Sequence, residues 1–277
     1  MLAFFSSFLK KESIDCYAAI PLSDCRVRKP YLLERAGIED GTVIIMAVPY
    51  FSSACNSPDR NLSAYAVSRD YHLFFQQLFE RLLAELRERY PQNKFVAFAD
   101  HSPIDEVNAA AKAGLGMIGK NQLLITPRYS SYVFLGEVIT DAVLPCKSLP
   151  ITLCENCGKC LLECPMQECG VCLSALTQKK GTLSEEETLC VVKHGSLWGC
   201  DLCQEACPHT QKAIREHTIE SPVPFFREQH LTRLSTTLLE EMPDGVFAER
   251  AYAWRGKHTV LRNAELMEAF EKGATKC

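Results

Sequence analysis

The spacing of its cysteines is the feature that most constrains this 277-residue chain. One region contains Cys154-x2-Cys157-x2-Cys160-x3-Cys164-Pro165, a run typical of bacterial ferredoxins. In such a run three thiolates bind one 4Fe–4S cluster and the fourth reaches a second cluster. Zinc is the main alternative, but zinc sites rarely place three ligands at x2 spacing before a Cys-Pro pair. The run therefore favours iron–sulfur clusters.

A second set of cysteines completes the two clusters. It reads Cys200-x2-Cys203-x3-Cys207-Pro208, which repeats the end of the first motif without its first cysteine. Because ligation is crossed in two-cluster ferredoxins, each cluster takes a ligand from the other motif. One cluster is predicted on Cys154, Cys157, Cys160 and Cys207, and the other on Cys164, Cys200, Cys203 and one of Cys169, Cys172 or Cys190.

Charge and apolar content place the chain in a broad class. Its net charge of −4 and its hydrophobic content of 47% are typical of a globular protein that buries a core, as one large or two smaller domains. Residues 1–15 contain a short apolar run with no basic segment before it and no small-residue cleavage site after it, so we expect an amphipathic first helix and no signal peptide. An odd number of cysteines without a secretion signal favours thiolate ligands in a reducing compartment over disulfides. We expect a cytoplasmic protein with no membrane span, since no apolar run reaches about 18 residues.

A glycine-rich stretch, AGLGMIGKNQLL at residues 113–124, matches two nucleotide-binding patterns. Such loops lie between a strand and the helix whose N-terminus binds phosphate. The order here is reversed, because a helix predicted at 105–113, with Ser102 as its N-cap, comes before the glycines. Gly114 is therefore predicted to end that helix, and Asn121 replaces the magnesium-binding Ser or Thr of a phosphate loop. We reject both nucleotide interpretations and expect a connection packed closely against protein or cofactor.

Several segments together resemble one enzyme family. The chain is similar to epoxyqueuosine reductases, cobalamin-dependent enzymes of tRNA modification that carry two iron–sulfur clusters and are related to reductive dehalogenases. The resemblance covers roughly residues 43–264, without the C-terminal helical-repeat domain of many members, so a short member is expected. The segments that carry it are SAYAVSRDYH (63–72), DHSP (100–103), AGLGMIGKN (113–121), FLGEVITD (134–141), CLSALTQKKG (172–181), GCDLCQEACP (199–208) and LRNA (261–264).

The resemblance implies an α+β fold. A nitroreductase-like, cobalamin-binding core with a mainly antiparallel sheet would be followed by a helical, ferredoxin-like domain for two 4Fe–4S clusters. The expected domains are a catalytic domain at 1–145, an iron–sulfur domain at 146–220 and a helical tail at 221–277. Hydrophobic patterns predict the elements of the core. Strands are expected at 43–48, 95–99, 123–125 and 132–140, and helices at 71–90 and 105–113.

The resemblance also implies which residues form the site. The family cysteine that precedes an LSxLT segment is Cys172, which would complete the second cluster and leave Cys169 and Cys190 as spectators. Asp100 is the family-matched acid, and burial beneath the corrin would have to raise its pKa against the effect of the following helix N-terminus. His72 lies in an amphipathic helical pattern and is not expected to bind cobalt. The expected cobalamin contacts are Ser63, Tyr71, Asp100, Leu124, Leu135, Lys180 and Asp201, with simple core packing as the alternative for the two leucines.

The implied activity is two-electron reduction of the epoxide of epoxyqueuosine in tRNA to queuosine, with cob(I)alamin fed by the clusters. The expected partners are the tRNA anticodon loop and a low-potential electron donor such as a flavodoxin or ferredoxin, with no membrane. Two alternatives stay open: a cobalamin-dependent reductase or dehalogenase of a small molecule, and a non-enzymatic iron–sulfur electron carrier. A basic cluster in the tail is a candidate phosphate contact or ordinary surface, and consists of Trp254, Arg255, Lys257, His258 and Arg262.

Overall fold

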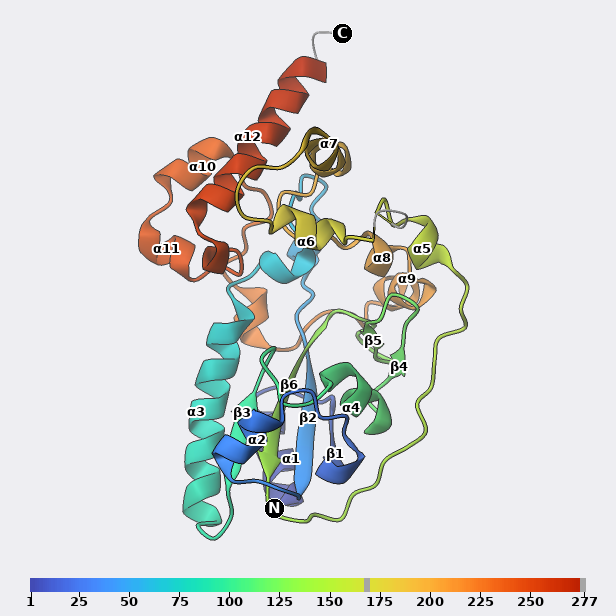
Figure 1. Ribbon diagram of the computed structural model, residues 1–277, viewed down its shortest axis with the longest axis vertical. Helices are drawn as coiled ribbons and strands as arrows, with labels where there is room; N and C mark the ends of the chain where they lie inside the picture. The colour runs from blue at the N-terminus through green and yellow to red at the C-terminus, as the bar shows by residue number, and fades with distance from the viewer. Residues whose placement is uncertain (167–169, 275–277) are drawn as a thin grey trace. The chain divides into compact units, whose positions relative to one another are not determined.

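The computed structural model describes residues 1–166 and 170–274, with helices and strands as labelled in Figure 1. The chain divides into two compact units, each assembled from segments that are far apart in sequence. In the described part of the chain, no helix is both long enough and apolar enough to cross a bilayer. Unit 1 comprises Met1–Tyr50, Tyr71–Cys157 and Pro208–Pro224, and unit 2 comprises Phe51–Asp70, Gly158–Cys207 and Phe225–Cys277.

A four-stranded sheet forms the centre of unit 1. Its order is β1-β2-β6-β3, and every neighbouring pair is antiparallel. The mainly antiparallel sheet expected from the resemblance is thus confirmed. β2 is buried along its whole length, because its apolar sequence TVIIMAVP packs on both faces of the sheet. The strands are β1 (Tyr17–Pro21), β2 (Thr42–Pro49), β3 (Phe95–Phe98) and β6 (Val133–Thr140).

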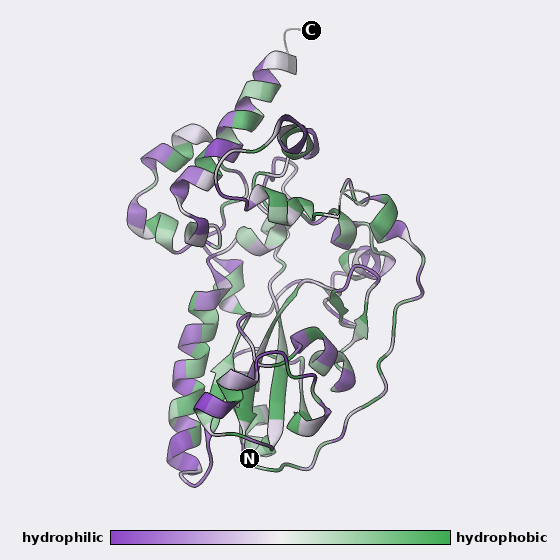
Figure 2. Cartoon of the chain, viewed as in Figure 1, coloured by the Kyte–Doolittle hydropathy of each residue, from purple (hydrophilic) through white to green (hydrophobic). Residues whose placement is uncertain are grey.

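Helices cover both faces of this sheet (Figure 1). α4 (Glu106–Lys112) packs its buried alanines into a core cluster shared with Leu135 of β6. α3 (Tyr71–Arg89) packs on the opposite face, where Gly136 leaves room for a ring, since an added Cβ would lie 2.3 Å from Phe75 Cε1. Figure 2 shows polar and apolar stripes along α3, as expected of a helix with one buried side. The other elements of unit 1 are α1 (Leu2–Lys11), η1 (Leu22–Asp24), α2 (Pro30–Ala36), β4 (Met117–Ile118), β5 (Leu124–Ile125) and α9 (Pro208–Arg215).

Most of the predicted elements are confirmed. The expected strands correspond to β2, β3, β5 and β6, and the two expected helices to α3 and α4. The predicted helix cap is wrong, because α4 begins after Asp105, whose side chain accepts the Asn108 N–H, while the Ser102 hydroxyl bonds elsewhere. β1 and β4 are not predicted, since YAAIP and MI are too short to show a clear period.

Unit 2 is built mainly of short helices around two apolar clusters. One surrounds Trp198 and Tyr252, and the other holds Leu173, Leu176 and Val191. The described helices of this unit are η2 (Ser53–Asn56), η3 (Ala64–Ala66), α5 (Lys159–Leu162), α6 (Leu173–Thr177), α7 (Glu185–His194), α8 (Leu202–Glu205), α10 (Thr236–Glu241), α11 (Asp244–Ala248), η5 (Ala253–Arg255) and α12 (Lys257–Ala274), with η4 (Pro224–Arg227) at its boundary with unit 1.

A buried asparagine ties together three of the segments that carry the family resemblance. The Asn263 side chain, in the LRNA segment, donates to the Thr177 carbonyl at 2.7 Å and to the Leu197 carbonyl at 2.9 Å. The Thr177 hydroxyl in turn accepts the Gly199 N–H at 2.9 Å. These bonds fix the start of GCDLCQEACP within unit 2.

Candidate functional site

Asp100, the predicted acid, lies in the loop that follows β3. Its φ is +68°, and the His101 N–H donates to the Ala99 carbonyl at 2.8 Å, which places Asp100 at the centre of a strained γ-turn. The Asp100 side chain is 69% exposed, and its Oδ2 lies 3.8 Å from Nε2 of His72 in the first turn of α3. The turn therefore presents an open carboxylate beside an imidazole.

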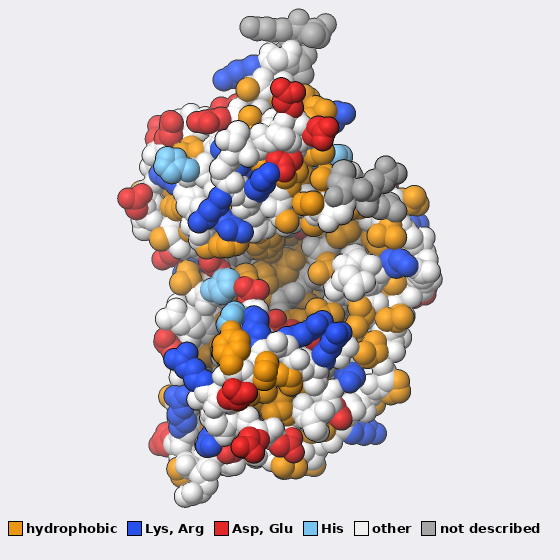
Figure 3. Space-filling view, in the orientation of Figure 1, with side chains coloured by type: hydrophobic (Ala, Val, Ile, Leu, Met, Phe, Trp, Pro, Cys, Tyr) orange, Lys and Arg blue, Asp and Glu red, His pale blue; other side chains and the backbone are white. Residues whose placement is uncertain are grey.

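The pKa of Asp100 is lowered, which is opposite to the direction that an acid at neutral pH needs. The interaction with His72 lowers this pKa most, partial burial opposes the shift, and the charges of Lys29 and His101 lower it further. Lys29 Nζ lies 3.1 Å from His101 Nδ1, and Figure 3 shows histidine side chains beside Lys and Arg on the visible face of unit 1. A ligand that covered this carboxylate and excluded water would raise its pKa.

Aromatic and aliphatic candidates for the cofactor site lie beside this loop in unit 1. Tyr71, which precedes His72, stacks on Phe134 of β6 with ring centroids 4.2 Å apart and 15° between the planes. Leu135 is half-buried and Leu124 is buried, and both pack in the core cluster of α4. Core packing therefore accounts for Leu124, whereas Tyr71 and Phe134 belong to a run of stacked rings, with Tyr50 4.3 Å from Phe134 and His72 4.1 Å from Tyr71.

Two glutamates close to the Asp100 loop form a feature that the sequence analysis did not predict. Glu137 lies in β6, is fully buried and accepts a hydrogen bond from the Ser102 hydroxyl. Glu106 is the first residue of α4, and its pKa is influenced by the neighbouring Glu137 and by the Asp100 backbone. Among the described residues, Glu106 Oε1 and Glu137 Oε2 are buried without a hydrogen-bond partner. Burial raises both pKa values, that of Glu106 to about 7, and the charge of Glu106 raises that of Glu137 further.

The glycine-rich stretch ends a helix and then forms a hairpin. The Gly114 and Leu115 N–H groups donate back to the Ala111 and Ala110 carbonyls, each at 3.0 Å, and Gly114 has a φ of +85°. This is the Schellman arrangement, so the prediction that Gly114 ends the helix is confirmed. Gly119 then begins the turn between β4 and β5. The stretch therefore lacks the strand, loop and helix order of a nucleotide-binding loop.

The same stretch packs against the first predicted cluster ligand. The Cys154 N–H donates to the Ile118 carbonyl at 3.1 Å, and the Lys120 N–H lies 3.3 Å from Cys154 Sγ. Gly116 permits the close packing of the hairpin, since an added Cβ would lie 2.3 Å from the Ile125 carbonyl oxygen. Hydrogen bonds to ligand sulfurs tune the potential of iron–sulfur clusters. The glycine-rich stretch therefore packs closely against protein, and one of its contacts is Cys154, a predicted cluster ligand.

The predicted cluster ligands are divided between the two units. Cys154 and Cys157 belong to unit 1, and the other six belong to unit 2. No disulfide joins the cysteines that the structure describes. Within residues 1–166 and 170–274, no three Cys, His, Asp or Glu side chains are arranged to hold a metal ion. Cys172, the expected eighth ligand, is exposed and Cys190 is half-buried, while Cys169 lies outside the described residues.

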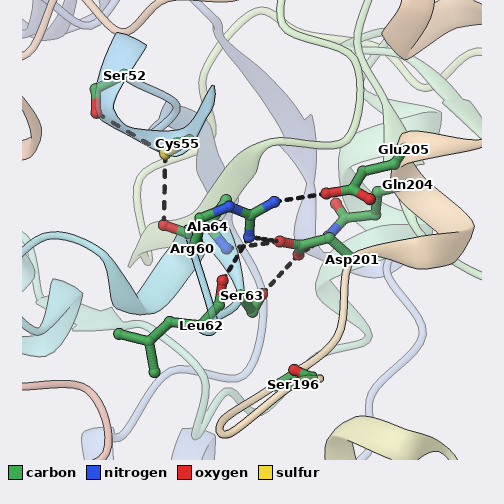
Figure 4. Close-up of polar contacts among 11 residues, drawn as sticks. Ser52, Cys55, Arg60, Leu62, Ser63, Ala64, Ser196, Asp201, Gln204 and Glu205 are labelled. Carbon is green, nitrogen blue, oxygen red and sulfur yellow. Dashed lines mark hydrogen bonds and ion pairs between the residues drawn. The ribbon is translucent and has the colours of Figure 1, made fainter. Parts of the chain in front are cut away.

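Ser63 and Asp201, two predicted cobalamin contacts, lie side by side in unit 2 (Figure 4). Asp201 is only 5% exposed. Its Oδ1 accepts the Ser63 hydroxyl at 2.6 Å and the Gln204 amide at 3.1 Å. Its Oδ2 accepts the Ala64 N–H at 2.6 Å and Arg60 Nη1 at 2.8 Å. Four protein donors therefore satisfy this buried carboxylate.

Arg60 supplies the counter-charge in this network. Its side chain is 15% exposed, and its second terminal nitrogen lies 2.5 Å from Glu205 Oε1 (Figure 4). Asp201 and Glu205 flank Cys203, a predicted ligand, within the GCDLCQEACP segment. Arg60 thus anchors a ligand-bearing segment to residues 51–70 of the same unit.

Lys180, the remaining predicted cobalamin contact of unit 2, is exposed on its surface. Arg262, from the basic cluster, donates to the Lys179 carbonyl at 2.7 Å and so holds this loop in place. Arg255 stacks on the exposed Trp254 ring at 3.9 Å. Of the basic cluster, Arg262 has a structural contact, while Trp254 and Arg255 form a surface pair.

The unpredicted residues differ in the signal that the sequence offers for them. Glu137 stands inside the strand pattern FLGEVITD, where alternation places it on the same face as the buried Ile139. A glutamate at such a position indicates a buried carboxyl. Arg60 carries no comparable signal, because its partner Asp201 lies 141 residues further along the chain.

Comparisons with known proteins agree with one another. A family model described as epoxyqueuosine reductase QueG, DUF1730, matches residues 37–101. An epoxyqueuosine reductase of Listeria monocytogenes is 31% identical over 96% of this chain, which spans 73% of that protein. A solved epoxyqueuosine reductase from Streptococcus thermophilus matches with a TM-score of 0.78 at 22% identity, over 96% of this chain and 80% of the other. Another, crystallised with a tRNA-Tyr epoxyqueuosine-modified stem loop, matches with a TM-score of 0.72 at 22% identity, over 96% and 81%.

Proposed function

The chain belongs to the epoxyqueuosine reductase family, and we propose that it reduces the epoxide of epoxyqueuosine in tRNA to give queuosine. The observation that carries this proposal is the 31% identity to the Listeria monocytogenes enzyme over 96% of the chain. The solved relative with a modified stem loop supports tRNA as the form in which the substrate is bound. The reaction takes up two electrons and two protons, breaks both bonds from carbon to the epoxide oxygen and releases that oxygen as water.

Two 4Fe–4S clusters and a cobalamin are the proposed cofactors, and when bound they would supply electrons at low potential. The donor set fits the clusters, because its thiols have ferredoxin spacing and the Lys120 N–H is aimed at Cys154 Sγ. Half-buried Tyr71, held by its stack on Phe134, is the proposed aromatic contact for the macrocycle. The proposed cluster ligands are Cys154, Cys157, Cys160 and Cys207 for one cluster and Cys164, Cys172, Cys200 and Cys203 for the other.

Asp100 has the central role among the chain's own residues. Its γ-turn presents the carboxyl group outward, and His72 lies beside Oδ2. When substrate and cofactor cover this carboxyl, the loss of water raises its pKa and favours the protonated form. Asp100 then gives its proton to the departing oxygen, which as an alkoxide would be a poor leaving group.

Asp100→Asn tests this role. Anaerobically reconstituted protein is given an epoxyqueuosine-containing anticodon stem loop and a low-potential donor, and product is detected by the mass change for one lost oxygen. We expect the variant to retain its cofactors and to react on the order of a hundredfold more slowly. Asp59→Asn, at an exposed aspartate, is the matched control and should react normally. An Asp100→Asn variant with normal turnover would contradict the proposed role.

The salt dependence of the reaction tests the substrate class. Turnover of the stem loop should fall as salt rises, because protein contacts with phosphates release counterions, while turnover of the free nucleoside should hardly respond. Equal and salt-insensitive rates would favour a small-molecule reductase. No reduction of either substrate by fully loaded protein would contradict the proposed activity.

A further inference from the structure

A short basic segment lies against the loop that carries Asp100. Residues 26–31, RVRKPY, contain three cations and no carboxylate, although the whole chain has a net charge of −4. A protein with a negative net charge has to gather positive charge locally in order to attract a polyanion. We call residues 26–31 the basic rim, and its composition makes it a candidate for such a surface.

Backbone hydrogen bonds fix the basic rim to the loop of the proposed acid. The Arg28 and Lys29 N–H groups both donate to the Pro103 carbonyl, at 2.8 and 3.0 Å. The Asp105 N–H donates to the Arg26 carbonyl at 2.9 Å. Both segments belong to unit 1. The rim is thus already ordered in the free protein, so a ligand that binds it does not have to order it.

Two side chains of the basic rim reach His101, the residue after Asp100. Lys29 Nζ lies 3.1 Å from Nδ1 of His101, and the Tyr31 hydroxyl lies 3.1 Å from Nε2. Because an ammonium can only donate, Nδ1 accepts and the ring proton lies on Nε2, which donates it to the phenol oxygen. Among the described residues, neither Lys29 Nζ nor the Tyr31 hydroxyl has a further hydrogen-bond partner. The Tyr31 O–H and two protons of Lys29 Nζ can therefore bind an acceptor on a ligand.

The basic rim presents both charge and an aromatic face to solvent. Arg26 is exposed, and Arg28 is half exposed but engaged by Asp105 at 2.8 Å. Tyr31 is 53% exposed, and no ring or cation in the described part of the chain stacks on it. Figure 3 shows Lys and Arg side chains gathered beside histidine on the visible face of unit 1. Single-stranded RNA suits this combination, because cations contact its phosphates and aromatic rings stack on its unpaired bases.

We propose that the basic rim binds the anticodon loop beside the modified nucleoside, with Arg26 and Lys29 on phosphates and Tyr31 stacked on an unpaired base. This inference rests on the proposed function for the identity of the RNA. The rim would hold neighbouring nucleotides and would not touch the reacting atoms. Its residues should therefore act on substrate binding and leave the chemical step almost unchanged.

The salt dependence of binding tests the phosphate contacts. The holoprotein is titrated into a labelled, unmodified anticodon stem loop, and binding is followed by fluorescence anisotropy. In the double variant Arg26→Gln with Lys29→Gln, affinity should fall on the order of tenfold at about 0.1 M salt. The slope of log K against log salt should become shallower by about 1.4, because each contact with a single-stranded phosphate contributes about 0.7. Wild-type affinity and slope in this variant would overturn the proposal.

A control variant removes the same charge elsewhere in unit 1. Lys10→Gln with Arg87→Gln changes exposed residues of α1 and α3. Arg87 lies roughly 20 Å along α3 from His72, which adjoins the loop of the proposed acid. We expect the affinity and the salt slope of this control to match the wild type. An equal loss in the control would mean that net charge alone determines binding, and it would overturn the assignment to the rim.

Two substitutions at Tyr31 separate stacking from hydrogen bonding. Tyr31→Phe keeps the ring and should weaken binding of the stem loop only about threefold. Tyr31→Ala removes the ring and should weaken it about tenfold or more, with a salt slope like that of the wild type. Wild-type affinity in Tyr31→Ala would overturn the stack. Polyglutamate that competes as well as the stem loop at equal charge would show a general polyanion surface and would overturn the assignment to RNA.

Turnover separates this inference from the proposed function. With the epoxide in a stem loop, the basic-rim variants should raise KM and leave kcat nearly unchanged, while turnover of the free nucleoside should not respond. A protein that never reduces the epoxide but binds the stem loop with the expected pattern would remove the proposed function and leave the rim standing. Normal epoxide reduction with unaltered binding in every rim variant would do the reverse.

Discussion

Two buried carboxyl groups in this chain are compensated in opposite ways. Asp201 in unit 2 receives four donors, and one of them is the Arg60 guanidinium. Glu137 in unit 1 receives one hydroxyl and faces a second carboxyl, that of Glu106. Burial raises the pKa of Glu137, whereas Asp201 forms an ion pair. Burial alone therefore does not determine what a carboxyl group does; the donors around it decide.

The two arrangements suit different tasks. Asp201 lies next to Cys200 in a segment with predicted cluster ligands, where an ion pair with fixed geometry keeps the backbone in one conformation. Glu137 accepts a hydrogen bond from Ser102, two residues after Asp100, and burial raises the Glu137 pKa. The contrast predicts that equivalent substitutions have opposite effects in the two units.

The largest effect is expected for Arg60→Met. This change leaves the Asp201 carboxylate buried without its cation, a loss that typically costs 3–5 kcal/mol. Because Arg60 is 15% exposed and the pair is not completely buried, we expect a loss of about 3 kcal/mol in the free energy of unfolding, at the low end of this range. Chemical unfolding of reconstituted protein measures it. Arg233→Met is the control in the same unit, since the pair of Arg233 and Glu271 is half exposed and should contribute less than about 1 kcal/mol. Equal losses in Arg60→Met and Arg233→Met would mean that the buried pair of Arg60 and Asp201 stabilises the fold no more than an exposed pair does.

Asp201→Asn should cost less than Arg60→Met, because Glu205 still accepts from Arg60. The amide nitrogen would face donors that the carboxylate now accepts, so we expect a loss of about 2 kcal/mol in the free energy of unfolding. The double variant Arg60→Met with Asp201→Asn should lose less than the sum of the single variants, since the two residues contact each other. Additive losses in unfolding experiments would contradict a direct coupling.

What could be predicted from the sequence is local in character. Cysteine spacing is read from neighbouring residues, and the long amphipathic pattern of α3 and the apolar run of β2 each define their element without outside help. The cap of α4 shows the limit of this approach. Ser102 and Asp105 can both cap a helix, and only the distant Glu137, which takes the Ser102 hydroxyl, decides between them.

The candidate site depends more on long-range contacts. Asp100 was identified through its family position, but neither its γ-turn nor its contact with His72 follows from a local pattern. The partner of Asp201 is 141 residues away, and Ser102 reaches Glu137 over 35 residues. Which carboxyl finds a cation and which finds another carboxyl is determined by tertiary packing, and hydrophobic periodicity carries no information about it.

Glu137→Gln should have the opposite sign to Asp201→Asn. The pKa values of Glu106 and Glu137 are raised in the folded state. The stability that the two groups contribute is therefore present below the unfolded pKa of about 4.3, and it is lost as pH rises through the folded pKa values. Between about pH 5 and 8 the wild type should therefore lose more stability than the variant. At alkaline pH we expect the variant to be the more stable protein by about 1 kcal/mol. Unfolding at several pH values measures the difference, with the exposed Glu88→Gln as control. Parallel pH curves for wild type and Glu137→Gln would mean that the pair is not protonated in the folded state.

The smallest effect on stability is expected at Asp100, which is neither buried nor compensated by a close ion pair. His72→Gln removes the interaction that lowers the Asp100 pKa most, so this pKa should rise toward its ordinary value in a carbon-13 titration. A lowered pKa contributes stability above the unfolded value, and that stability is lost as pH falls through the folded value. The contribution of the lowered Asp100 pKa should therefore vanish in acid, and His72→Gln should remove it at neutral pH.

The size of this loss should be small. With 69% of the Asp100 side chain exposed, solvent screens the charges, and the loss in the free energy of unfolding should stay below about 0.5 kcal/mol. His258→Gln, at an exposed histidine in unit 2, should leave both the titration and the stability unchanged. A much larger loss in His72→Gln would mean that the imidazole supports the fold of the loop and does more than shift the Asp100 pKa.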